Sequence, residues 1–163
     1  MASNLFSTMP TIRGTVEISA SPERVWNIIA NPANLPRLAP YVLSSEFDPP
    51  GLMTKGAKGH AIGMMAGRKV DVYAEVAEAE PNKKLSLKQR PGGVLKFLST
   101  TITLEPTEKG TLAKEEFQFE VSMGALGKAL SALVIERSIR KNAGEYLQNL
   151  KKIAENQETP SKA

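Results

Sequence analysis

The 163-residue sequence has no cysteine and only one histidine, His60. The lack of cysteine excludes disulfide bonds, thiolate nucleophiles and cysteine-bound zinc or iron–sulfur clusters. A single histidine also argues against a histidine-rich metal site. The sequence therefore predicts neither a metal ion nor any other cofactor.

Long apolar runs are missing as well. No stretch reaches the roughly 18 consecutive apolar residues of a membrane-spanning helix. The segment Met1–Pro10 lacks the basic and apolar regions of a signal peptide. We therefore expect a cytoplasmic protein without an integral membrane segment.

Charge of one sign is scarce too, since 21 basic residues are interleaved with 17 acidic ones for a net charge of +4. Aromatic residues make up 6% of the chain, and none lies in the Arg/Lys-rich strand context of an RNA-binding sheet. Nucleic-acid binding is not indicated.

The remaining composition, 41% hydrophobic and 23% charged, is that of one globular domain. We expect a flexible leader over residues 1–10, a folded domain over 11–155 and a flexible tail over 156–163.

The order of the predicted elements is a strand, two short helices, six strands and a long helix. Residues 11–19 alternate between apolar and polar, which predicts a half-buried strand. Ser21 and Pro22 predict a helix start, and Pro32 and Pro40 bound a second short helix that carries Leu38 inward. Turn signals divide residues 41–121 into six strands of an antiparallel meander with one apolar face.

Residues 124–156 contain no proline and predict a long helix that crosses the sheet. Its second half is amphipathic. Its first half carries small alanines such as Ala129 on one side and a leucine face on the other. That leucine face consists of Leu126, Leu130, Leu133 and Val134. The pattern suits a helix that borders a void, or one whose leucine face is left outside for a partner.

The segment VEISASPERVW, residues 16–26, resembles the opening motif of the START-like (SRPBCC) superfamily, and Asn31-Pro32 and Leu38-Ala39-Pro40 extend the resemblance. Within the superfamily the chain resembles polyketide cyclase/dehydrase-like and coenzyme Q-binding-like members, and members similar to one of the carbon monoxide dehydrogenase proteins. The resemblance implies an α+β helix-grip fold, in which a seven-stranded antiparallel sheet wraps around the long helix. It also implies a cavity between them for a lipid, quinone, polyketide or other apolar ligand.

Several residues are candidates to line that cavity, although plain core packing is the alternative for each. Phe117 and Phe119 share a phase on the last strand, whereas Phe97 reaches the cavity only if a bulge reverses its direction. Met64 suits an adaptable entrance. The full set of candidate ligand-binding residues is Leu38, Tyr41, Met64, Phe97, Phe117, Phe119, Ala129, Leu130 and Leu133.

His60 and Glu115 are candidate catalytic residues. His60 shares a strand phase with Met64, and Glu115 shares one with Phe117. If both face inward, they could form an acid/base pair for enolisation or dehydration of a polyketide. The alternatives are that a bulge turns Glu115 to solvent and that His60 lies on a rim.

Three functions are therefore open from the sequence. The first is a carrier or sequestering protein for an apolar small molecule, which suits the few convergent polar groups. The second is a cyclase or dehydratase that uses His60 and Glu115. The third is an accessory domain that forms a homodimer or binds a peripheral protein partner through the leucine face.

Overall fold

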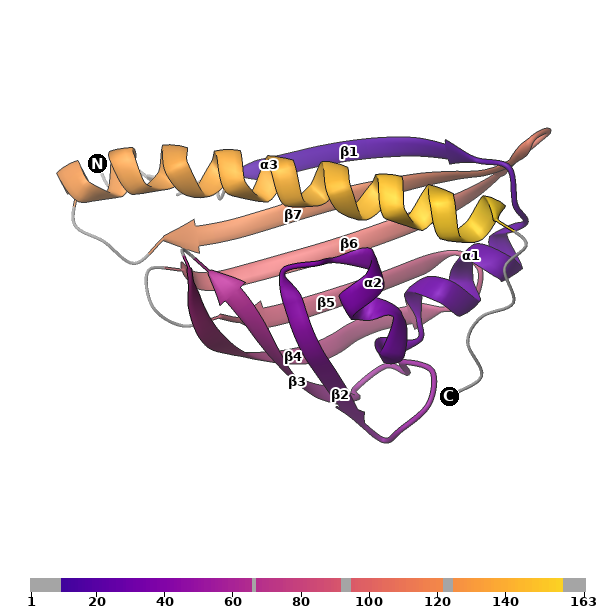
Figure 1. The fold of residues 1–163 in the computed structure, drawn as a ribbon, viewed down its shortest axis with the longest axis horizontal. Coiled ribbons are helices and arrows are strands. Elements are labelled where there is room, and N and C mark those ends of the chain that lie inside the picture. The colour runs from indigo at the N-terminus through magenta and orange to yellow at the C-terminus, as the bar shows by residue number, and fades with distance from the viewer. Residues whose placement is uncertain (1–9, 66, 92–94, 122–124, 157–163) are drawn as a thin grey trace, which may run out of the picture.

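In a computed structural model of the chain, one antiparallel sheet wraps around a long C-terminal helix (Figure 1). The structure describes residues 10–65, 67–91, 95–121 and 125–156, and the side chains of 125–132 lie outside that description. The strands are β1 (Thr11–Ile18), β2 (Val42–Asp48), β3 (Lys58–Met65), β4 (Arg68–Glu80), β5 (Lys84–Arg90), β6 (Leu95–Thr107) and β7 (Gly110–Val121). The helices are α1 (Pro22–Ile29), the 3-10 turn η1 (Pro32–Asn34), α2 (Leu35–Leu38) and α3 (Ala125–Glu155).

The predicted helix starts are confirmed. The Arg24 backbone N–H donates to Ser21 Oγ at 3.2 Å, which satisfies one of the free donors at the start of α1. Asn31 caps η1 in the same way, because its side-chain oxygen accepts from the Ala33 backbone N–H at 3.1 Å.

The strand order is β1-β7-β6-β5-β4-β3-β2, and every neighbouring pair is antiparallel. Strands β2 to β7 form a meander, and β1 joins the sheet beside the last strand. This is the predicted α+β helix-grip arrangement.

The expectation that α3 crosses the whole sheet is wrong. Helix α3 lies along β1 and β7, which form its main contacts with the sheet (Figure 1). Ile12 of β1 packs with Ile139 and Ala143 of α3 in one buried cluster. Helices α1 and α2 contact the C-terminal part of α3. The sheet curves around these helices, so its central strands approach α3 less closely than β1 and β7 do.

The core has two parts. The smaller cluster holds Phe117 and Phe119 of β7 against Ile139 of α3. The larger one packs α1, α2 and the C-terminal half of α3 against the sheet, with Trp26 and Leu150 among its buried residues. A cavity lies where the two clusters meet.

Candidate functional site

The internal cavity has a volume of about 110 Å³. Side chains of the sheet, of α1 and α2, of the segments beside β2 and of α3 line it. The apolar members are Ile29, Leu35, Ala39, Val42, Met53, Leu85, Leu87, Leu98, Ile102 and Phe117, and the polar ones are Tyr41, Gln89, Thr100, Glu115 and Tyr146.

Strand register explains which side chains face this cavity. Directly paired residues of an antiparallel sheet share a face. Glu115 of β7 pairs with Ile102 of β6, which pairs with Leu85 of β5. Two residues along, Phe117 pairs with Thr100. The alternation of β5, β6 and β7 therefore points one set of residues at α3 and the other set away from it.

Glu115 is the ionisable group that the fold buries most completely at this site. Its side chain is 2% exposed, and its Oε2 atom has no hydrogen-bond partner among the described residues. Removal from water disfavours the charged carboxylate and raises the pKa of Glu115 to about 8. At neutral pH the group is mainly a neutral carboxylic acid, which can donate one hydrogen bond and accept others.

Two tyrosines accompany Glu115. Tyr41 precedes β2, and Tyr146 projects from α3. Burial raises the pKa of both phenols, and the nearby Glu115 carboxyl raises each pKa further. The cavity wall therefore carries three oxygen-bearing groups that lie within electrostatic reach of one another.

The other two polar side chains of the lining satisfy each other. Gln89 donates from Nε2 to Thr100 Oγ1 at 2.9 Å. Because this bond already uses the amide and the hydroxyl, Glu115 is the group of the cavity whose hydrogen-bonding capacity is unused.

Three of the residues predicted from the sequence line this cavity: Tyr41, Phe117 and Glu115. Two others are core residues behind it. Leu38 and Phe119 are fully buried, and each packs in one of the two core clusters.

Phe97 and Met64 face away from the cavity. A bulge does interrupt the pairing of β6 and β7 between Leu95 and Phe97. It leaves Phe97 opposite Glu120, whereas Leu98 lies opposite the inward Phe119. Met64 pairs with Lys69 and is 38% exposed. Neither residue therefore contributes to the lining.

His60 lies on the outer face of the sheet. Its neighbour Gly59 pairs with Ala74, which pairs with Gln89 of the cavity lining, so His60 and its partner Tyr73 point the other way. The imidazole Nε2 lies 2.7 Å from Asp71 Oδ1, and its ring centroid lies 5.0 Å from that of Tyr73. The structure does not bring His60 and Glu115 together, and the acid/base pair inferred from strand phase is not formed.

The leucine face of α3 is only partly described. Ala129, Leu130 and Leu126 have side chains outside the described residues. Leu133 is 48% exposed and Val134 is 61% exposed. These two residues do not line the cavity.

Sequence reasoning missed Tyr146, Gln89, Thr100 and Met53 as lining residues. Tyr146 was readable only as one member of the amphipathic face of the last helix. Gln89 and Thr100 share strand phases with Leu87 and Ile102, which was the available signal. Met53 lies in a loop between strands, where no periodicity exists to show that it is buried.

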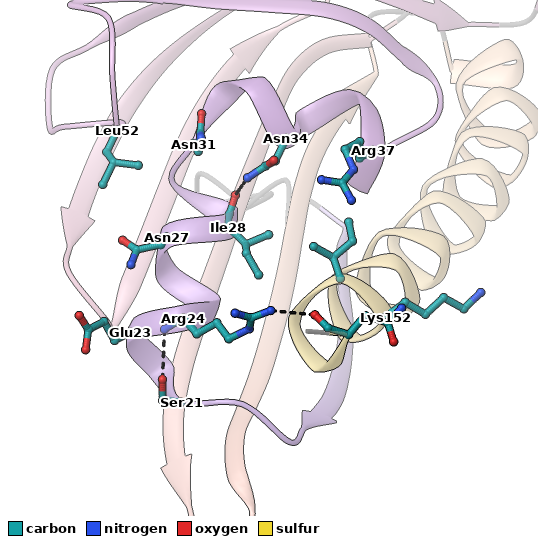
Figure 2. A pocket seen from close by; sticks show the side chains of 12 residues that line it. Ser21, Glu23, Arg24, Asn27, Ile28, Asn31, Asn34, Arg37, Leu52 and Lys152 are labelled. Atoms are coloured by element: carbon teal, nitrogen blue, oxygen red, sulfur yellow. Dashed lines mark hydrogen bonds between the residues drawn. The ribbon is translucent and has the colours of Figure 1, made fainter. Parts of the chain in front are cut away.

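A second hollow lies on the surface, where α1, η1 and α2 meet the C-terminal end of α3 (Figure 2). Its volume is about 580 Å³. Its polar side chains are used to hold the fold: Arg24 donates to the carbonyls of Ala154 and Asn156, and Asn34 donates to that of Ile28. We therefore take the internal cavity as the candidate site.

Other kinds of site find no support in the part of the chain that the structure describes. No group of three or more His, Asp or Glu residues there could hold a metal ion. Within those same residues, no helix is long and apolar enough to cross a membrane.

The fold and the cavity together define a helix-grip domain of the START-like superfamily. The family model described as "Polyketide cyclase / dehydrase and lipid transport" matches residues 9–155, so the chain belongs to that family. This confirms the superfamily predicted from the opening motif. No curated protein matches the chain.

Solved structures share the fold at low sequence identity. The Zhui aromatase/cyclase from Streptomyces sp. R1128 is 14% identical with a TM-score of 0.78, over 90% of this chain and 94% of its own. The TTHA0849 protein from Thermus thermophilus is 22% identical with a TM-score of 0.72, over 88% of this chain and 95% of its own. Ara h 8.0201 is 12% identical with a TM-score of 0.67, over 90% of this chain and 97% of its own. At these identities the likeness shows the fold and transfers no function.

Proposed function

We propose that the chain binds a small, predominantly apolar molecule in the internal cavity and acts as a carrier or sequestering protein. The observation that carries this proposal is a cavity lined mostly by aliphatic side chains that also holds a buried carboxyl without a partner. Ligand sites commonly combine an apolar wall with a few polar groups that orient the ligand. The family description, which includes lipid transport, agrees with this role.

The volume of the cavity bears on ligand size. About 110 Å³ is below the roughly 300 to 1,000 Å³ of sites for drug-sized ligands. An apolar cavity of roughly 150 Å³ is large enough for benzene. A compound of about that size fits with little change, whereas a lipid, quinone or polyketide has to widen the cavity as it binds.

Native mass spectrometry of protein purified without detergent tests the proposal, followed by organic extraction of whatever is bound. We expect a stoichiometric apolar compound, or uptake of one from a panel of small ketones, quinones and fatty acids. Failure to bind any member of the panel would overturn the carrier function.

A pair of variants connects any binding to this cavity. Leu87→Phe adds volume at the lining and should weaken or abolish binding. Leu112→Phe makes the same chemical change on the outer face of β7, where Leu112 pairs with Glu17 and Glu105, and should leave binding unchanged. Equal effects of the two variants would place the ligand elsewhere.

The alternative is an enzyme of the cyclase or dehydratase type, and the chemistry of Glu115 favours it as the second candidate. A buried carboxyl with a pKa of about 8 can take a proton from carbon next to a carbonyl. Returning that proton to a departing hydroxyl forms a carbon–carbon double bond and releases water. His60 has no part in this version, because it lies on the other face of the sheet.

Mass spectrometry also tests the enzymatic alternative. The protein is incubated with short β-hydroxy ketones, and the products are examined for loss of one water. We expect Glu115→Gln to lose the activity and His60→Asn to retain it. Equal conversion by the native protein and by Glu115→Gln would remove the assignment.

A further inference from the structure

The polar groups of the cavity indicate which chemical class of ligand it accepts. Glu115 from β7, Tyr41 from the segment before β2 and Tyr146 from α3 all line it. The three come from different parts of the chain, and the Glu115 carboxyl acts electrostatically on both phenols. Each group can donate a hydrogen bond to an oxygen atom placed among them.

The unused capacity of Glu115 is the key observation. Its Oε2 atom is buried without a partner among the described residues, and such a group costs about 1 to 3 kcal/mol when it stays unpaired. The neighbouring Gln89 amide and Thr100 hydroxyl are already bonded to each other. A ligand oxygen at Glu115 would supply the missing partner.

The surroundings of Glu115 provide no positive charge. Opposite it in the sheet lie Gly14 of β1 and Ile102 of β6. The titratable groups that face it are Tyr41 and Tyr146, while the exposed Glu145 of α3 adds only negative charge to the region. Over the described part of the lining there is no lysine, arginine, histidine or aspartate. Burial therefore keeps the carboxyl protonated at neutral pH.

We propose that the ligand is an uncharged molecule with an apolar body and one carbonyl or hydroxyl oxygen, which binds at Glu115 beside Tyr41 and Tyr146. This inference rests on the proposed binding function and adds a polar selection to it. A cationic amine is disfavoured, because it would have to leave water and also draw the buried carboxyl into its charged form.

Three probes of one shape separate the chemical classes: cyclohexanone, methylcyclohexane and cyclohexylammonium, which keeps its charge to about pH 10. Binding to the full chain is measured by ligand-observed NMR at about pH 6.5 and about pH 9.5, on either side of the Glu115 pKa. At the lower pH we expect cyclohexanone to bind about three- to tenfold more tightly than methylcyclohexane, and cyclohexylammonium to bind most weakly. At the higher pH the preference for the ketone should shrink, because the ionised carboxylate no longer donates.

Two variants show whether Glu115 causes the preference. Glu115→Leu removes the polar group at similar size, so it should bind both neutral probes with about equal affinity. Glu115→Gln keeps a donor, so it should retain the ketone preference and lose its dependence on pH. Glu116→Gln, on the outer face beside Arg13, is the matched control and should behave as the native protein.

The outcomes distinguish the two levels of the account. If none of the three probes binds the native protein, the binding function itself fails, and this inference fails with it. If methylcyclohexane binds as tightly as cyclohexanone, or cyclohexylammonium binds best, the cavity binds ligands but the inferred ligand class is overturned. The inference is also overturned if Glu115→Leu keeps the ketone preference.

Discussion

Gly14 of β1 lies directly under Leu147 of α3, and a Cβ atom built on Gly14 would be 3.0 Å from Leu147 Cδ1. Leu147 is itself buried in the larger core cluster. The missing side chain at Gly14 therefore lets α3 lie close to β1. Gly14 also pairs with Glu115, so this contact borders the strand that carries the candidate site.

We expect Gly14→Ala to lower the free energy of unfolding by about 1 kcal/mol. Overpacking a core costs about 1 to 3 kcal/mol, while removing a glycine from the unfolded chain returns about 0.4 to 1 kcal/mol. Urea denaturation measures the difference. Gly144→Ala is the control, because nothing lies within 4 Å of its added Cβ and it should stabilise α3 by about 0.5 to 1 kcal/mol. A stabilised Gly14→Ala would contradict the close packing.

Arg24 fixes the end of α3 and should matter for stability. Its Nε donates to the Ala154 carbonyl at 2.6 Å, and its Nη2 donates to the Asn156 carbonyl at 2.8 Å (Figure 2). Its charge also suits the negative end of the helix dipole. We expect Arg24→Met to cost about 1.5 to 3 kcal/mol in chemical denaturation.

The exposed Arg37 lines the same surface hollow and is the matched control for Arg24. Arg37→Met should change the unfolding free energy by less than about 0.5 kcal/mol. Equal losses for the two variants would indicate a general charge effect instead of a specific clamp.

Glu115 should make the protein less stable as the pH rises. Burial raises its pKa from 4.5 to about 8, so below pH 4.5 both the folded and the unfolded chain hold the proton. Between these values only the unfolded chain releases it, which lowers the stability by about 1.4 kcal/mol per pH unit. Above the folded pKa the loss stays constant. Glu115→Gln lacks this contribution and should gain stability relative to the native protein from about pH 5 to about pH 8.

Urea denaturation across that pH range checks the prediction for Glu115. Glu116→Gln changes the neighbouring residue, whose carboxylate pairs with Arg13 at 2.9 Å on the outer face. Its stability should follow the native pH profile with a small offset, as expected for a surface ion pair. Parallel profiles for native protein and Glu115→Gln would mean that Glu115 titrates normally.

His60 should have no influence on the cavity. It pairs with Asp71 on the face of the sheet that points away from α3, with both side chains well exposed. We expect His60→Asn to bind cyclohexanone with an affinity within about a factor of two of the native value. A large loss of binding, with the fold intact by circular dichroism, would show that the outer face belongs to the site.

Local sequence signals predicted the fold well. Ser21 with Pro22 and Asn31 with Pro32 mark the helix starts by a mechanism that acts within a few residues. The alternation of β7 placed Phe117 and Glu115 on one face, and the structure has both at the cavity. These inferences needed no knowledge of distant partners.

Inferences that depend on pairing between distant strands were less secure. The inward direction of His60 depended on which residues of β3 lie opposite Ala74, and a register is set by the whole sheet. The bulge near Leu95 could be suggested from the glycines before it, but its effect on Phe97 could not. The approach of Tyr146 to Glu115 depends on where α3 settles on the sheet, which no local pattern encodes.

The most direct test of the central claim is a methyl NMR titration of the full chain with cyclohexanone. Methyl groups of Leu87, Leu98 and Ile102 line the internal cavity, and those of Leu52 and Ile153 line the surface hollow. The account predicts saturable shifts at the first three and none at the other two. Shifts confined to Leu52 and Ile153, or no saturable shift at all, would contradict a ligand site between the sheet and α3.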